Sequence, residues 1–144
     1  MSVNIERIHS KRVYNDPQLQ KRLRFLTNGG WGRHEEGSGM LEWIEGRGLQ
    51  YVWLLRDSTE AIIAWAAIGR WPYDPESYVG VYVARHARRK GYGTMLAIEA
   101  MKFAENLEFT VRYSPWDRKG VALYDKAGYS RSTYMLHRHD SDRW

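Results

Sequence analysis

The order of apolar and polar positions along the chain predicts a mixed α/β domain. Apolar runs typical of strands occur at 3–8, 49–56, 61–71, 78–83, 107–113 and 129–137. Apolar residues at helical spacing occur at 17–26, 40–45, 93–105 and 121–127. Asp16 and Pro17 open the first helix, and Asp57–Glu60 turn the second strand into the third. Strands precede a strand–helix–strand–helix–strand run, which predicts a mixed sheet flanked by helices.

Length and composition narrow the class of protein. The chain has 144 residues, of which 43% are hydrophobic, and this predicts one packed domain with a sizeable core. No apolar run is long enough to cross a bilayer, and the N-terminus carries no apolar signal region, so we expect a soluble, cytoplasmic protein. The absence of cysteine excludes disulfides, thiolate metal sites and a cysteine-bound acyl intermediate.

The charge and the aromatic content of the chain indicate which partners it could bind. A formal net charge of +5 favours anionic partners such as cofactor phosphates, nucleic acid or an acidic surface. Seven Trp and ten Tyr are many for this length. Packing in the core and in grooves explains them more simply than base stacking does, and base stacking stays as the alternative.

A basic glycine loop lies between a predicted strand and a predicted helix. The segment Arg88–Thr94 reads RRKGYGT and directly follows the strand region that ends at Val83. The first turn of a helix leaves N–H groups without intrahelical partners, and the helix dipole adds partial positive charge there. Gly91 and Gly93 carry no side chain, so the backbone can approach a ligand closely. The loop therefore predicts a site for a phosphate or pyrophosphate.

Two familiar phosphate motifs do not describe this loop. No Gly-Lys-Ser/Thr sequence closes it as in a Walker loop, and Leu96 stands where the dinucleotide fingerprint needs a third glycine. A second block, Gly120–Tyr129 with sequence GVALYDKAGY, lies farther along the chain. Either block alone is a weak signal, but the two in this order are specific.

The pair of blocks resembles the GCN5-related N-acetyltransferases, the GNAT family. In that family a strand is followed by Arg/Gln-x-x-Gly-x-Gly/Ala and a helix, and Arg88–Gly93 matches this block fully. Leu123–Tyr129 matches the family's Leu-Tyr-x-Lys-x-Gly-Phe block, with Tyr129 in place of Phe. The resemblance implies a single GNAT-like domain over 1–144, with a central mixed, mostly antiparallel sheet and about four helices.

The resemblance implies acetyl-CoA as the co-substrate and no metal. In that case the pyrophosphate lies on the amides of Arg89–Thr94, and the pantetheine arm pairs with the exposed backbone of Val81 and Val83. The implied cofactor-binding residues are Val81, Val83, Arg88, Arg89, Lys90, Gly91, Tyr92, Gly93 and Thr94. A homodimer is compatible with the family.

The resemblance implies acetyl transfer to a primary amine, on a small molecule or on a lysine or N-terminus of a protein, and this reaction gains from an oxyanion donor, an acid and a base. The oxyanion needs a fixed donor, for which the resemblance implies the N–H of Val83. The departing thiolate gains from an acid, for which it implies Tyr124. Reference pKa values of about 10 for a phenol and about 8.5 for a thiol make this proton transfer only mildly uphill. Packing against the CoA arm is the alternative role of Tyr124.

The general base is left unassigned by the sequence. Many members of the family carry a Glu on the strand before the glycine loop, where this chain has Ser77 and Val79. Glu76 is adjacent but faces the other side of a regular strand. The other candidates are Glu35, Glu36 and Glu42.

The segment between the first two helices usually borders the acceptor site in this family. Here Trp31, Glu35 and Glu36 offer an aromatic wall and carboxylates, which suit a cationic amine. A simply solvated Glu pair is the alternative. His137–Asp142 has residue types of metal ligands, but a charged tail without a second cluster explains it better.

Two other functions stay open beside a transferase of small amines or proteins. Arg88–Lys90 could grip the phosphates of nucleic acid in a basic module without chemistry. Some members of the family acetylate charged tRNA as toxins, and a basic surface suits that activity. A regulatory domain that binds acetyl-CoA without catalysis is the remaining class.

Overall fold

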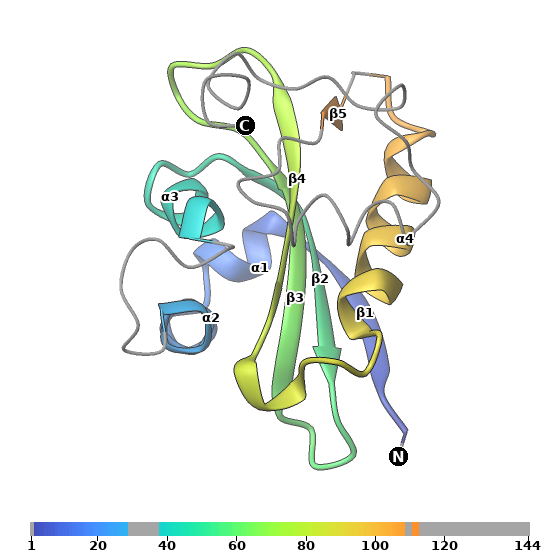
Figure 1. The fold of residues 1–144 in the computed structure, drawn as a ribbon. Helices are drawn as coiled ribbons and strands as arrows, with labels where there is room; N and C mark the ends of the chain where they lie inside the picture. Colours follow the sequence, from blue (N-terminus) through green and yellow to red (C-terminus); the bar gives the residue numbers. More distant parts are fainter. Residues whose placement is uncertain (1, 29–37, 109–110, 113–144) are drawn as a thin grey trace.

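The computed structural model describes residues 2–28, 38–108 and 111–112 (Figure 1). Its strands, in chain order, are β1 (Asn4–His9), β2 (Leu49–Arg56), β3 (Ile62–Gly69), β4 (Ser77–Val83) and β5 (Val111–Arg112). Its helices are α1 (Ser10–Tyr14), α2 (Pro17–Asn28), α3 (Ser38–Glu45) and α4 (Tyr92–Ala104), with one 3₁₀ turn, η1 (Arg85–Ala87).

The strands form one sheet in the order β1-β2-β3-β4-β5. β1 to β4 are antiparallel neighbours, whereas β5 runs parallel to β4 and pairs Val111 with Ser77 and Arg112 with Tyr78. The predicted hairpin is confirmed, because β2 and β3 pair antiparallel across a turn in which Asp57 accepts hydrogen bonds from Thr59. The prediction of a mixed, mostly antiparallel sheet with about four helices is thus confirmed over the described residues.

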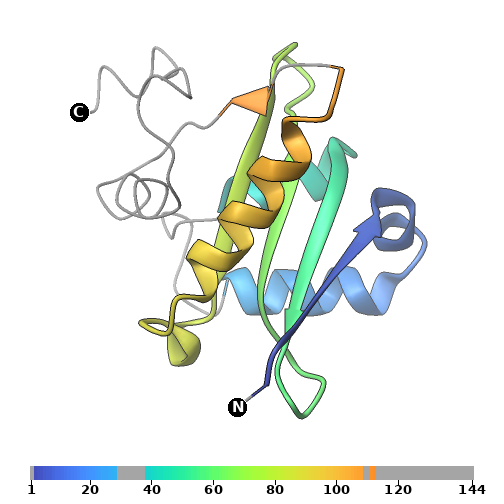
Figure 2. The ribbon, with the colours of Figure 1, turned by 90° about the vertical axis from the view of Figure 1, so that its right-hand side faces the viewer.

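Helices cover both faces of the sheet. α4 lies on one face and α1, α2 and α3 on the other, as Figures 1 and 2 show. β3 is buried along its whole length between two apolar clusters, one under α4 and one under α1 to α3. A buried hydrogen bond from Nε1 of Trp65 to Oγ1 of Thr27 (2.7 Å) ties α2 to β3. The core therefore holds β4, which borders the site described below, in a fixed place.

α3 packs closely on β4 because Gly80 has no side chain. A Cβ at this position would lie 2.8 Å from Cγ of Met40 and 3.4 Å from Cη2 of Trp43. Real Cβ atoms essentially never come as close as the first of these distances. The glycine therefore allows α3 to rest on the backbone of β4.

Two differences from the sequence prediction have local causes. α1 was not predicted, since five residues are too few to show a helical period. The strand predicted from 107 is wrong at its start: Leu107 and Glu108 are not in a strand. Leu107 instead donates its N–H to the carbonyl of Ala104 (3.1 Å), which prolongs the last turn of α4.

The helix predicted at 121–127 and the strand at 129–137 lie outside the described residues. None of the helices in the described part of the chain has the length and apolar character that a membrane span requires.

Candidate active site

The outer edge of β4 directs backbone hydrogen-bonding groups away from the rest of the sheet. Ala84 donates its N–H to the carbonyl of Ile63 (2.9 Å), directly next to the last residue pair of the β3–β4 ladder, Ala64 and Val83. The polar backbone groups of Ala84 therefore point toward β3. Polar groups of successive strand residues point to opposite edges, so the N–H and C=O of Val81 and Val83 point away from β3. Among the described residues, β5 pairs with β4 only at Ser77 and Tyr78. An extended, amide-bearing ligand can pair with the remaining segment, which we call the open edge (Val79–Val83).

Arg88 folds back onto the end of this edge. Its Nε donates a hydrogen bond to the carbonyl oxygen of Val83 (2.9 Å), and its guanidinium carbon lies 5.4 Å from the ring centroid of Tyr82. The first contact confirms that the carbonyl of Val83 points outward, as the ladder requires. With that acceptor engaged by Arg88, the N–H of Val83 is the group that the residue can offer a ligand.

The glycine loop brings the chain from the open edge to the N-terminus of α4. Arg89 (φ 66°) and Gly91 (φ 83°) both have left-handed backbone conformations, which turn the chain sharply at this point. Gly91 is the N-cap residue and provides no side-chain cap, and the first helical hydrogen bond runs from Met95 to Gly91 (3.1 Å). The N–H groups of the first turn therefore have no intrahelical partner.

Electrostatics at the same place favour an anion. The first turn of α4 contains no acidic residue, and the side chains of Arg89 and Lys90 are exposed beside it. A Cβ at Gly91 would meet no atom of the described residues within 4 Å, so these residues leave space for a ligand beside the backbone. The helix dipole adds positive potential at this end. These residues fit the pyrophosphate of a nucleotide cofactor.

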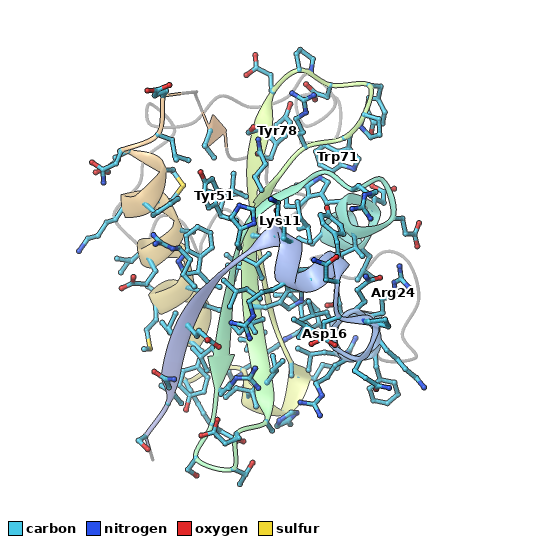
Figure 3. The ribbon with its side chains drawn as sticks, turned by 180° about the vertical axis from the view of Figure 1, so that it is seen from behind. Lys11, Asp16, Arg24, Tyr51, Trp71 and Tyr78 are labelled. Atoms are coloured by element: carbon cyan, nitrogen blue, oxygen red, sulfur yellow. The ribbon has the colours of Figure 1, made fainter. Side chains whose placement is uncertain are left out.

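A group of aromatic and acidic side chains lies at the other end of the open edge, on the α3 side of the sheet. We call it the aromatic–acidic wall; its members are Trp71, Tyr73, Tyr78, Glu42 and Asp74. Trp71 packs edge-on against Tyr78 (5.2 Å between centroids) and stacks with Tyr73 (6.4 Å, 23° between planes). Figure 3 shows Trp71 and Tyr78 side by side.

Neutral donors hold both carboxylates of the wall. Nε1 of Trp71 donates to Oε2 of Glu42 (2.7 Å), and Oη of Tyr78 donates to Oδ2 of Asp74 (2.8 Å). Although 81% of Tyr73 is exposed, partial loss of solvent around its phenol raises the pKa, and the negative charges of Glu42 and Asp74 raise it further. Both carboxylates therefore act on the same phenol.

The two strand positions where the resemblance implies a general base, Ser77 and Val79, contain no carboxylate. Ser77 and Val79 are buried in β4, and Val79 belongs to the apolar cluster under α4. Glu76 precedes β4 and donates its backbone N–H to Oδ1 of Asp74 (2.9 Å). Glu42 lies on α3, with its carboxylate bound to Trp71.

The structure brings together the predicted cofactor-binding residues 81–94 on one strand, one loop and one helix end. The predicted acid Tyr124 and the predicted acceptor residues Trp31, Glu35 and Glu36 lie outside the described residues. In the part of the chain that is described, no group of three or more His, Asp or Glu side chains could hold a metal ion.

The aromatic–acidic wall was missed from the sequence. The signal in the sequence was two aromatic residues, Trp71 and Tyr73, next to Asp74 in a short polar segment. Its partners Glu42 and Tyr78 come from a helix and a strand, so only the fold brings the five together.

Comparison with known proteins identifies the family. The model of the acetyltransferase (GNAT) family matches residues 11–129. The chain therefore belongs to the GNAT family, whose members carry out acetyl-CoA-dependent acetyl transfer. The comparison with curated proteins gives no match.

Solved structures share the fold at low sequence identity. A presumed acetyltransferase of Exiguobacterium sp. 255-15 superposes with a TM-score of 0.62 at 19% identity, covering 90% of this chain and 86% of that one. A predicted acetyltransferase of Clostridium acetobutylicum with acetyl-CoA gives 0.57 at 18% identity, covering 94% and 95%. Glucosamine-6-phosphate N-acetyltransferase of Arabidopsis thaliana gives 0.58 at 14% identity, covering 95% and 97%.

Proposed function

We propose that this chain is an N-acetyltransferase, formed by a single domain over residues 1–144, that moves the acetyl group of acetyl-CoA directly to a primary amine. The observation that carries the proposal is the continuity of the open edge of β4 with the N-terminus of α4. One end offers outward backbone groups at Val81 and Val83, and the other offers amides and cations at 89–94. This arrangement suits a ligand with an amide-bearing arm and a pyrophosphate, as acetyl-CoA is.

The reaction needs a bond from nitrogen to the acetyl carbon and the breaking of the carbon–sulfur bond. The N–H of Val83 is placed to donate to the carbonyl oxygen as negative charge develops there. The hydrogen bond from Arg88 to the carbonyl of Val83 fixes the next peptide group, between residues 83 and 84, and so supports this role only indirectly. The thiolate takes a proton from Tyr124, and the amine loses one to water or to a carboxylate.

Three measurements on the purified chain test the proposal. Acetyl-CoA should raise the melting temperature by mass action. An amine panel should then release free CoA, and mass spectrometry of the products should show acetyl on nitrogen. No thermal shift at saturating acetyl-CoA would refute cofactor binding, and a shift without CoA release would leave the non-catalytic regulatory function.

Tyr124→Phe tests the proposed acid. We expect kcat to fall while the affinity for acetyl-CoA stays nearly unchanged, because the phenol acts on the leaving group only. Turnover equal to that of the parent protein, with chemistry rate-limiting, would remove Tyr124 from this role.

A nucleic-acid ligand is the second candidate, favoured by the charge of α2. This helix carries Lys21, Arg22 and Arg24 and no acidic residue, and Phe25 beside them is 80% exposed. Cations grip phosphates and an exposed ring can stack on a base. Gel shifts with tRNA and DNA at two salt concentrations test this function, and acetylation of charged tRNA would join it to the first.

A further inference from the structure

We propose that a groove between β1 and α4, which we call the β1–α4 groove, binds a free α-amino acid with an apolar side chain. The groove is separate from the proposed acetyl-CoA site, because β2 and β3 lie between β1 and β4. With about 4.8 Å between neighbouring strands, β1 lies about 14 Å from β4 across the sheet. The groove has the size, the apolar floor and the separate charges that such a ligand needs.

The β1–α4 groove forms at the side of the sheet that α4 leaves uncovered. Figure 2 shows α4 in front of the sheet and β1 to one side of it. Ile5 and Arg7 line the groove from β1, where residues two apart share a face. Its volume of about 390 Å³ is near the lower end of the range for small-molecule sites, about 300–1,000 Å³. A ligand of the size of an amino acid therefore suits the groove better than a nucleotide cofactor does.

Aromatic and aliphatic side chains form the floor of the groove. Phe103 packs edge-on against Tyr51 (4.7 Å between centroids) and against Trp53 (5.5 Å). Trp53 is only 2% exposed, and Ile5 and Phe103 pack against the same apolar cluster under α4. An apolar side chain of a ligand that lies on this floor is removed from water, which favours binding.

Charged side chains from both elements line the groove beside this floor. The guanidinium carbon of Arg7 lies 4.3 Å from the ring centroid of Phe103, so the charge of a β1 residue reaches α4. Glu99 and Lys102 line the groove from α4, three positions apart and thus close enough to pair. Yet among the described residues no ion pair or side-chain hydrogen bond engages the charged group of Arg7, Glu99 or Lys102. The groove therefore offers charges of both signs to a ligand.

An α-amino acid matches these groups together. Its carboxylate suits Arg7 and Lys102, and its ammonium suits Glu99. Asn106 adds an acceptor, because its Nδ2 donates to the carbonyl of Lys102 (3.3 Å) and no described residue donates to its side-chain oxygen. A ligand with only a carboxylate would lie beside Glu99 unpaired, and a ligand with only an ammonium would meet two cations. The lining thus favours a zwitterion with an apolar side chain.

Calorimetry in the absence of acetyl-CoA compares three ligands that share a phenyl ring. L-phenylalanine carries both charges, 3-phenylpropanoate lacks the ammonium, and 2-phenylethylamine lacks the carboxylate. We expect L-phenylalanine to bind about twofold to fivefold more tightly than 3-phenylpropanoate, the effect of one exposed ion pair. We expect 2-phenylethylamine to bind most weakly, because it leaves two cations without a partner. Equal affinity for the three ligands, or no detectable binding, would overturn the inference.

Substitutions of exposed groove residues test the charges one at a time. Lys102→Gln should weaken L-phenylalanine and 3-phenylpropanoate alike, by about twofold to fivefold. Glu99→Gln should weaken only L-phenylalanine, because 3-phenylpropanoate has no ammonium. Lys11→Gln removes an exposed charge on α1, away from the groove lining, and should change neither affinity. Equal effects of Lys102→Gln and Lys11→Gln would show that net charge, and not the groove, sets the affinity.

Nuclear magnetic resonance of the ¹⁵N-labelled protein locates the bound ligand. L-phenylalanine should give its largest shifts at the backbone amides of 5–7 and 99–106, and smaller ones at 89–94. Largest shifts outside the groove would refute the site even if the affinities agreed. These measurements use no acetyl-CoA, so they hold or fail separately from the proposed transferase function.

Discussion

Substitutions of Gly91 can separate the loss of folding stability caused by backbone strain from the loss of binding affinity caused by blocking a ligand. Its φ of 83° is a conformation that side-chain-bearing residues avoid, by roughly 1–2 kcal/mol. A Cβ at this position meets no atom within 4 Å, so Gly91→Ala adds no clash within the described structure. Alanine also lowers the entropy of the unfolded chain, which returns about 0.4–1 kcal/mol. The net loss of stability should therefore be about 1 kcal/mol.

This loss converts to a measurable shift in melting temperature. An unfolding entropy of about 2.1 cal/mol/K per residue gives about 0.3 kcal/mol/K for 144 residues. Gly91→Ala should then lower Tm by about 3 °C. Its effect on the binding of acetyl-CoA should be larger, because the methyl group would stand where we propose that the pyrophosphate approaches the amides. Loss of one charge-assisted hydrogen bond, about 1.5–3 kcal/mol, weakens binding by about tenfold to a hundredfold.

Gly91→Asn is the matched control, since asparagine tolerates the left-handed conformation better than alanine. It should recover most of the lost Tm while still obstructing the ligand. Thermal unfolding and calorimetry with CoA measure the two effects separately. Parental CoA affinity in both variants would refute the placement of the pyrophosphate, and equal Tm losses would refute the strain argument.

Two other predictions concern the scaffold. Thr27→Val should lower stability by about 1–3 kcal/mol, because the buried Nε1 of Trp65 loses its partner, whereas Thr27→Ser should stay close to the parent in chemical denaturation. Hydrogen bonds from the side chain and backbone of Thr59 lower the pKa of Asp57 below its usual value of 3.8, so its charge contributes stability above that pH. Asp57→Asn should melt below the parent at neutral pH, and the gap should close as the pH falls through the lowered pKa; a constant gap from neutral to acidic pH would contradict this.

Sequence signals within a few residues were sufficient to predict those elements whose bounds are set by neighbouring residues. The bounds of β2, 49–56, were predicted correctly because the run is apolar and Asp57 begins a turn directly after it. Asp16 marked the start of α2 correctly, and its Oδ1 accepts the N–H of Leu19 (3.1 Å). The loop at 88–94 stood out because glycines and cations are unusual between a strand and a helix.

The parts that were missed depend on contacts between distant segments. The chain turns again after the end of α4, where Leu107 donates its N–H to Ala104, and the apolar run that was read as a strand does not reveal this contact. Arg88 was predicted only as a cofactor-binding residue, and its hydrogen bond to the carbonyl of Val83 was not foreseen from the sequence. The binding roles of 81–94 stay predictions until a ligand is measured.

The missing side chain of Gly80 has a consequence for how the position of α3 can change. Met40 lies close to where its Cβ would be, and Glu42 stands on the same helix. A larger residue at 80 must displace the side chain of Met40, and any part of that displacement that α3 takes up moves the Glu42 carboxylate relative to Trp71. The surface on the α3 side of the sheet could therefore drift during evolution, or be engineered, through a half-buried strand position beneath the helix.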